Sequence, residues 1–198
     1  MSHDYEDPWM RPTNAAEKGV RLLILALGYN PDSDTLRDTP CRVVRAYEEM
    51  TAGTNLDPTR HLKRTFPAEG TDHDEVIAVA GIDYVAVCEH HLLPFPGTAA
   101  VGYKPSPGAP VVGLSKLARL VEEYAQRLTM QERITRQVTD ALDTHLETEG
   151  AACVLRSHHM CMGIRGVRKP SAEMVTSSMT GIFRTNPSAR AEFLQLTR

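Results

Sequence analysis

The stretch VCEHHLLPF, residues 87–95, concentrates side chains that can bind a metal ion or move protons. Cys88 and His91 stand in a C-x-x-H arrangement, and this spacing lets both side chains bend toward one point. A thiolate together with an imidazole is a ligand pair that favours zinc. The imidazole of His90 is then left free beside the metal. The stretch therefore predicts a metal site with a proton-transfer group next to it.

A third ligand must come from elsewhere, and the stretch HHMC, residues 158–161, supplies candidates. If residues 151–161 form a strand, side chains alternate between its faces, so His159 and Cys161 share a face and His158 points the other way. Cys153 is on the same face as His159, but six residues away it lies about 20 Å along the strand and cannot easily join the same metal.

This alternation selects three metal ligands, which are Cys88, His91 and Cys161. Three protein ligands with one open position are the pattern of a catalytic zinc site, whereas four are typical of a structural one. Zinc held in this way lowers the pKa of its bound water toward about 7. The imidazoles of His90 and His159 are the side chains best placed to move protons there. The alternative interpretation is buried thiols and surface histidines without a metal.

A second group of residues could bind an anion. Ser115 can cap the helix of the SKLAR segment, and Lys116 and Arg119 lie in or near its first turn, away from the apolar positions. A helix N-terminus with two cations and a hydroxyl favours phosphate, although the same pattern also fits a solvated helix face. The segment GIRGVRK adds positive charge close to the expected metal, at Arg165, Arg168 and Lys169.

Glu132 has two possible roles. Thr129-x-x-Glu132 fits a capping box, which is purely structural. A carboxylate also pairs well with the N–H and amino donors on the edge of a guanine. The residues by themselves favour the cap.

The elements that must position these residues follow from periodicity and turn signals. Asn14 is a good N-cap for a helix that ends near Gly28, and Thr39-Pro40 opens a second helix. Residues 52–73 are polar and turn-rich, so they form a connector. Further elements are expected as strands over 75–88 and 98–103, helices over 115–128 and 130–150, and strands over 151–162 and 174–183. The chain is then divided into a disordered lead (1–13), a helical region with connector (14–73) and a catalytic domain (74–198).

Composition limits the classes of protein that need to be considered. With 198 residues, a net charge of −3 and a pI near 6.2, the chain is unlike a general nucleic-acid binder. The acidic start MSHDYEDPWM does not resemble a secretory signal, and the run LLILALG is far shorter than the roughly 20 residues of a membrane span. We therefore expect a cytoplasmic protein without membrane association, in which the cysteines serve metal binding or catalysis rather than disulfides.

Five motifs in series make a family resemblance. CEHHLLPF, GLSKLAR, QERIT, HMCM-x-x-RGV and the tail FRTNPSARAEFL resemble type I GTP cyclohydrolase, in order from about Pro40 to the C-terminus. The resemblance implies an α+β tunnelling fold, with an antiparallel sheet and helices packed on one face. It also implies a ring-forming homo-oligomer, typically a homodecamer, with active sites at subunit boundaries.

The resemblance assigns roles to individual residues. By position, Cys88, His91 and Cys161 match the zinc ligands, and His90 and His159 match the catalytic histidines. Glu132, with Gln131, matches the pair that reads guanine, so its expected role moves from cap to ligand. The residues around the triphosphate and ribose are matched by Ser115, Lys116, Arg119 and Arg165, and Arg42 is expected to reach a neighbouring subunit's triphosphate.

The implied reaction is the zinc-dependent hydrolytic opening of the imidazole ring of GTP at C8, with His159 protonating N7. A second hydrolysis releases formate. An Amadori rearrangement of the ribose, assisted by His90 and Ser115, then leads to ring closure as 7,8-dihydroneopterin triphosphate, which feeds folate or another pterin. Each proton transfer by a placed imidazole contributes roughly 10²- to 10⁴-fold.

Some positions depart from the family pattern. Arg156 stands where an acidic residue is expected, Thr98 replaces a lysine, Ala86-Val87 replaces Ser-Met or Ser-Thr, and His158 replaces a small or β-branched residue. None of these changes removes a ligand or a catalytic group. They leave two alternatives open: a diverged paralogue that uses another purine nucleotide or stops at a ring-opened intermediate, and a non-catalytic ring subunit with structural zinc.

Overall fold

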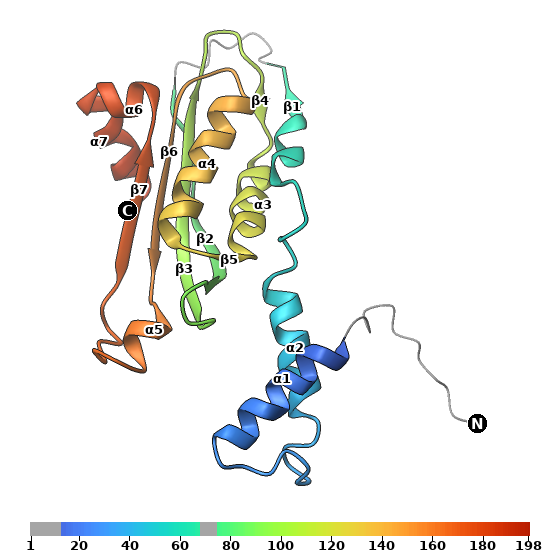
Figure 1. Cartoon of the computed structure of the whole chain (residues 1–198). Coiled ribbons are helices and arrows are strands. Elements are labelled where there is room, and N and C mark those ends of the chain that lie inside the picture. The colour runs from blue at the N-terminus through green and yellow to red at the C-terminus, as the bar shows by residue number, and fades with distance from the viewer. Residues whose placement is uncertain (1–12, 68–74) are drawn as a thin grey trace. The chain divides into compact units, whose positions relative to one another are not determined.

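The computed structural model describes residues 13–67 and 75–198, which belong to two compact units, Met1–Met50 and Thr51–Arg198 (Figure 1). Most of the lead expected to be disordered, residues 1–12, lies outside the described part, and Thr13 is already helical. The domain boundary expected between residues 73 and 74 also falls outside it and stays a prediction. Within the described ranges, no helix is both long and apolar enough to cross a membrane.

The first unit contains two helices, α1 (Thr13–Ala26) and α2 (Thr39–Met50). Gly28 follows α1 with a φ of 86°, a left-handed conformation that glycine adopts without steric cost. Its N–H donates to Leu25 O at 2.9 Å, and the next N–H, of Tyr29, donates to Ile24 O at 3.1 Å. The helix therefore ends in the glycine C-cap that the sequence predicts.

The second unit is built on a five-stranded sheet with the strand order β5-β2-β3-β6-β7. Its long strands pair antiparallel, and only the short β5 runs parallel to β2. A separate pair joins β1 (Thr65–Phe66) to β4 (Val111–Val112). The bounds of the five strands are β2 (Ile77–Cys88), β3 (Pro94–Pro105), β5 (Leu128–Thr129), β6 (Thr148–Ser157) and β7 (Met174–Met179).

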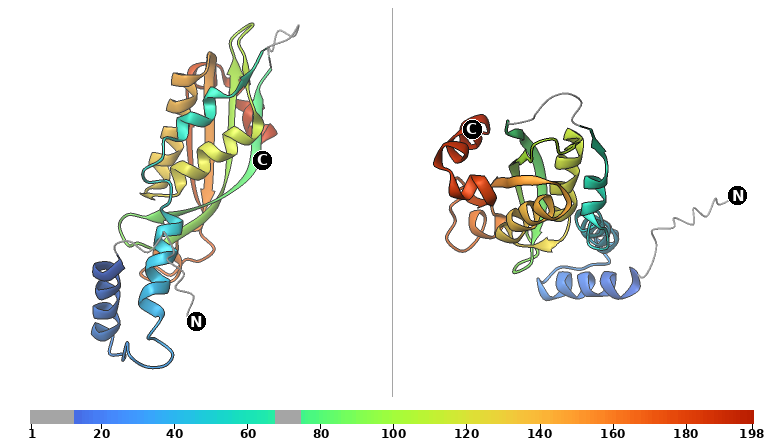
Figure 2. Two further views of the ribbon diagram at one scale, coloured as in Figure 1. Left: turned by 90° about the vertical axis from the view of Figure 1, so that its right-hand side faces the viewer. Right: turned by 90° about the horizontal axis from the view of Figure 1, so that it is seen from above.

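One face of this sheet is covered by α3 (Leu114–Ala125) and α4 (Gln131–His145), and the 3-10 helix η1 (Pro58–Lys63) packs against these two helices (Figures 1 and 2). The apolar stripe of α3 predicted from the sequence, Leu117, Leu120 and Val121, is buried in the core on this side. The core continues through the inward-facing residues of β2, β3 and β6, because successive side chains of a strand alternate between its faces.

The opposite face carries two short helices that the sequence analysis did not predict, α6 (Gly181–Thr185) and α7 (Pro187–Leu196), drawn in red in Figure 2. Phe183 and Phe193 are fully buried there against Ala100, Ala152 and Val154 of the sheet. The expected strand over 174–183 therefore ends at Met179, and a second, smaller core lies behind the sheet.

Two other expected elements end earlier than predicted. The helix over 130–150 stops at His145, and Thr148 to Gly150 already belong to β6. The expected strand over 151–162 stops at Ser157, which is the last residue paired with both neighbouring strands. The premise that residues 158–161 alternate as a strand is therefore wrong, because His159 instead precedes the short helix α5 (Met160–Gly163).

Candidate metal centre and active site

A tight turn at the end of β2 carries the first group of expected metal ligands. Cys88 N donates to Leu93 O at 2.9 Å, and Leu92 N donates to Cys88 O at 2.8 Å. This i to i+4 bond closes a single helical turn, in which residues three apart face the same side. Cys88 and His91 therefore project together, as the C-x-x-H spacing predicts. The turn is completed by Leu92 in the left-handed region, with a φ of 54°.

The second group lies just past the end of β6. His159 is the N-cap residue of α5, and the N–H groups of Met162 and Gly163 donate to its carbonyl oxygen at 3.0 and 2.9 Å. Cys161 lies in the first turn of α5. The helical backbone, and not strand alternation, places Cys161 beside His159, with Cys161 Sγ 4.0 Å from His159 Nδ1.

The two groups meet in one cluster. The ligand atoms of Cys88, His91 and Cys161 all lie within 4.8 Å of one another. Ligand atoms around a tetrahedral zinc with bond lengths near 2.3 Å are separated by roughly 3.8 Å, so small side-chain movements bring this set to metal-binding distances. The cluster could hold a metal ion with three protein ligands.

The chemistry of the two sulfurs also fits a cation. Burial raises the pKa of Cys161, and the neighbouring Cys88 thiol raises it further, because two thiolates close together repel each other. A divalent cation between them reverses this repulsion and favours both thiolates. Cys153, in contrast, is completely buried in the core and lies apart from the cluster, and burial raises the pKa of its thiol far above the ordinary range.

Two further imidazoles lie beside the cluster. His90 is exposed, and its Nδ1 is 3.8 Å from Cys88 Sγ. His159 is half-buried, and its ring stacks on Phe95 with centroids 4.4 Å apart and an interplanar angle of 8°. Burial lowers the pKa of His159, and the nearby carboxylate of Glu132 acts in the opposite direction. One imidazole is therefore solvated and the other is held against a ring.

The first turn of α4 contacts His159 at Nε2, the ring nitrogen on the side away from Cys161. Gln131 is completely buried, and its Oε1 lies 3.1 Å from His159 Nε2. The next residue, Glu132, is exposed. No capping box forms, because Thr129 belongs to β5 and Met130 is the N-cap residue without a side-chain cap. The structural role first favoured for Glu132 is therefore wrong.

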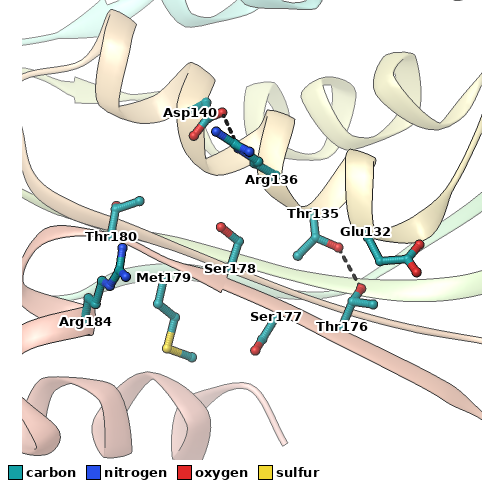
Figure 3. Close-up of a pocket in the computed structure, with 10 residues that line it drawn as sticks. All are labelled: Glu132, Thr135, Arg136, Asp140, Thr176, Ser177, Ser178, Met179, Thr180 and Arg184. Carbon is teal, nitrogen blue, oxygen red and sulfur yellow. Dashed lines mark hydrogen bonds and ion pairs between the residues drawn. The ribbon is translucent and has the colours of Figure 1, made fainter.

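Glu132 lines one end of a cleft of about 480 Å³ between α4 and β7 (Figure 3). Hydroxyl groups of β7 follow along its floor, and Arg184 of α6 lies at the other end. The carboxylate is thus accessible to a ligand and close to His159. The cleft is lined by Glu132, Thr135, Arg136, Asp140, Thr176, Ser177, Ser178, Met179, Thr180 and Arg184.

Glu89, between the ligand Cys88 and the imidazole of His90, has a partner on α4. Arg133 donates two hydrogen bonds to its carboxylate, at 2.6 and 3.0 Å, and this guanidinium lowers the pKa of Glu89. Glu89 N also donates to Thr129 O at 3.2 Å. The turn that carries Cys88 and His91 is therefore tied to α4 by side chain and backbone.

The residues expected to bind phosphate are found in three places. Arg165 follows α5 and is close enough to Cys161 to lower the pKa of its thiol, although burial and Cys88 outweigh this effect. Ser115, Lys116 and Arg119 lie at the start of α3, where Gly113 is the N-cap residue, so Ser115 is not the cap that the sequence suggested. Arg42 is exposed on α2 of the first unit and pairs with Asp38 at 3.4 Å.

Sequence reasoning missed three features of the site: the stacking of Phe95 on His159, the ion pair of Glu89 with Arg133, and the burial of the Gln131 side chain. Phe95 and Glu89 stand in the stretch that attracted attention first, but neither residue type signals its partner. Each partner is distant in the sequence, so no local pattern could have identified it.

Comparison with known proteins shows which family the chain belongs to. The family model described as GTP cyclohydrolase I matches residues 16–198. GTP cyclohydrolase 1 of Corynebacterium aurimucosum is 47% identical over 183 residues, which cover 92% of each chain. GTP cyclohydrolase 1 of Mycobacterium avium is 49% identical over 181 residues, covering 91% of this chain and 87% of the relative.

Among solved structures, the archaeosine synthase QueF-Like in its apo form is similar over 54% of this chain and 93% of its own, with a TM-score of 0.44 and 14% identity. The family model and the relatives span nearly the whole chain, from the N-terminal helices to the C-terminus. On this evidence the chain belongs to the GTP cyclohydrolase I family.

Proposed function

We propose that this protein is a zinc-dependent GTP cyclohydrolase. It opens the imidazole ring of GTP at C8, releases formate and forms 7,8-dihydroneopterin triphosphate. The observation that carries the proposal is the cluster of Cys88, His91 and Cys161, whose ligand atoms lie within 4.8 Å of one another in a member of this family. As a family member, the chain has the tunnelling fold that the resemblance implied.

Zinc is the metal that best suits this donor set. Two thiolates and one imidazole form a soft, nitrogen- and sulfur-rich site, and three protein ligands leave one position open. When bound, zinc supplies a Lewis acid that activates water for attack on C8 at neutral pH. A purely structural zinc would not need two additional imidazoles beside it, which disfavours a non-catalytic ring subunit.

The protein's own groups supply proton transfer and base recognition. His159, beside Cys161, protonates N7 during ring opening, and His90 assists the later rearrangement of the ribose together with Ser115. The exposed carboxylate of Glu132 pairs with the N1–H and amino group of the guanine. Glu132 lines the cleft and is near enough to His159 to act on the pKa of that imidazole, which supports this role, because base recognition then fixes C8 and N7 near the reacting groups.

The triphosphate site is proposed to lie at a subunit boundary. The C-terminal end of α3 leads into β5, whose Thr129 pairs with Cys88, whereas Ser115 and Lys116 are at the opposite end of the helix. A helix of 12 residues is about 18 Å long, so these groups are distant from their own metal cluster (Figure 1). A ring-forming homo-oligomer, expected to be a decamer, would let the start of α3 serve a neighbour's cluster, and Arg42 would reach a neighbour's triphosphate.

The departures from the family pattern lie outside the cluster. Ala86 is a buried core residue of β2, and Thr98 is exposed on β3. Arg156 is turned outward and pairs with Glu173 at 3.3 Å, and His158 is exposed. These environments support the parent activity over a diverged paralogue. The cytoplasmic location and the supply of folate or another pterin remain predictions.

The test is to incubate purified, zinc-loaded protein with GTP and to identify the products by mass spectrometry. We expect one formate for each GTP consumed and a product with the mass of dihydroneopterin triphosphate. Formate together with a ring-opened product would favour the diverged paralogue. No consumption of GTP by protein with a full complement of zinc would contradict the proposed activity.

A further inference from the structure

The side chain of Gln131 is completely buried, and each of its polar atoms already has a partner within the chain. Its amide nitrogen lies 3.0 Å from Leu155 O and 3.1 Å from Met174 O. Both partners are backbone carbonyls, which only accept hydrogen bonds, so the nitrogen must face them. The orientation of the amide is therefore fixed by its surroundings.

With the nitrogen fixed, Oε1 of Gln131 is an acceptor that points toward His159. It accepts a hydrogen bond from the hydroxyl of Ser157. It also lies 3.1 Å from His159 Nε2. Since an amide oxygen has no proton to give, Nε2 of His159 must carry one and donate it.

Nδ1, the other ring nitrogen of His159, is then the one that can accept a proton. In a neutral imidazole with its proton on Nε2, Nδ1 has the free lone pair. Nδ1 of His159 is also the nitrogen on the side of the metal cluster, 4.0 Å from Cys161 Sγ. The stacked ring of Phe95 keeps the imidazole in the plane that this arrangement requires.

We propose that Gln131 is a positioning residue for His159 and does not read the guanine through its side chain. Gln131 accepts a hydrogen bond from Nε2–H of His159 and so presents Nδ1, the nitrogen on the side of the metal cluster, to N7 of the substrate. This inference rests on the proposed function for its chemistry, but the assignment of the tautomer rests on the contacts alone.

Reading a base would require Gln131 to give up contacts that it already makes. A base could bind its amide only by breaking bonds to Leu155, Met174, Ser157 or His159 in a fully buried position, where unpaired polar groups are costly. The adjacent Glu132 is exposed, lines the cleft and needs no such exchange. Glu132 therefore recognises the guanine and Gln131 positions His159, although the family resemblance assigns base recognition to both residues.

The kinetic test compares Gln131→Met with Gln131→Glu. Methionine keeps much of the volume and removes the acceptor, so kcat should fall about 10- to 100-fold, with the KM for GTP within threefold and zinc content unchanged. A protonated glutamic acid keeps an oxygen that accepts from His159 and a hydroxyl that donates to Leu155 O, so Gln131→Glu should recover part of the lost kcat. A rise in KM with kcat retained, or no effect on either constant, would overturn the proposal.

Thr139→Val is the matched control. Thr139 is completely buried on the same side of α4 and bonds to Ser178 of β7 at 2.7 Å, but it does not contact His159. This variant should lower stability and leave kcat unchanged. A loss of kcat equal to that of Gln131→Met would show that packing of α4 on β7, and not the bond to His159, is what matters.

A spectroscopic measurement on the unchanged sequence keeps the inference testable if the Gln131 variants do not fold. Solid-state nitrogen NMR of histidine-labelled protein, with His159→Asn used for assignment, should show neutral His159 with its proton on Nε2. A spectrum with the proton on Nδ1 would refute the proposal. This readout is independent of turnover, so it separates a failure of the inference from a failure of the proposed activity.

Discussion

The metal cluster is assembled from two segments with similar sequences and different surroundings. Residues 88–91 and 158–161 each contain two adjacent histidines and a cysteine. In the first segment both histidines are exposed, and the side-chain contact that ties the segment to α4 is the partly exposed ion pair of Glu89 with Arg133. In the second segment His159 is stacked on a buried ring and bonded to a completely buried amide.

This difference indicates which segment can adjust and which is fixed. An exposed ion pair is screened by water and salt and stabilises its geometry only weakly. A buried amide with all partners in place holds its neighbour firmly, because any rearrangement leaves polar groups unpaired. We therefore expect ligand substitutions to have the largest effects, followed by changes at the fixed imidazole and then by changes at the exposed support.

Cys161→Ala should have the largest effect, since it removes the sulfur through which the second segment joins the cluster. We expect loss of bound zinc and a fall of turnover to the background rate, because two ligands do not make a stable site. Metal analysis of the purified protein and formate release from GTP measure the two effects. Full activity without bound metal would refute the ligand assignment.

His159→Ala should retain zinc and lose ring opening, with a decrease in formate release of roughly 10²- to 10⁴-fold, as expected for the loss of a general acid. His90→Ala is the comparison from the exposed segment. It should still release formate but fail to complete the rearrangement to the pterin, which mass spectrometry of the products would reveal. An unchanged rate of ring opening in His159→Ala would show that another acid does the work.

Glu89→Gln should have the smallest effect, because it removes only the exposed ion pair with Arg133. We expect less than about a fivefold decrease in zinc affinity, measured by competition with a chromophoric chelator. The arginine holds the pKa of Glu89 below its usual range, so the pair is complete above the unfolded-state pKa and is lost as the pH falls through the lowered folded-state value. Protonation of Glu89 at low pH should therefore weaken zinc binding in the unchanged protein. The Glu89→Gln variant should lack this part of the pH dependence.

Arg133→Met tests the same pair from the other side and should match Glu89→Gln, with no additional loss in the double variant. Additive losses would show that the two residues act separately. A loss as large as that of Cys161→Ala would reverse the distinction between a weakly and a strongly supported segment.

The segment 158–161 shows how a correct selection can come from a wrong premise. Strand alternation and a helical turn both place His159 and Cys161 near each other, so the ligand was selected although the strand ends at Ser157. Ser157 is the last residue with a strand partner on both sides, because β7 begins at Met174, directly opposite it, whereas β3 continues to Pro94. Periodicity along 151–162 contains no information about where the neighbouring strand begins.

Residue type and local spacing determined much of this protein. They predicted the convergence of Cys88 and His91, the apolar stripe of α3, the glycine cap of α1 and the donor set that suits zinc. The tertiary structure alone decided that the Gln131 side chain faces inward, that Glu89 binds Arg133, and that Phe95 supports His159. The physical reason is that ligand chemistry belongs to single residues and short turns, whereas the hydrogen-bond partner of a buried side chain is set by whichever distant segment the fold packs against it.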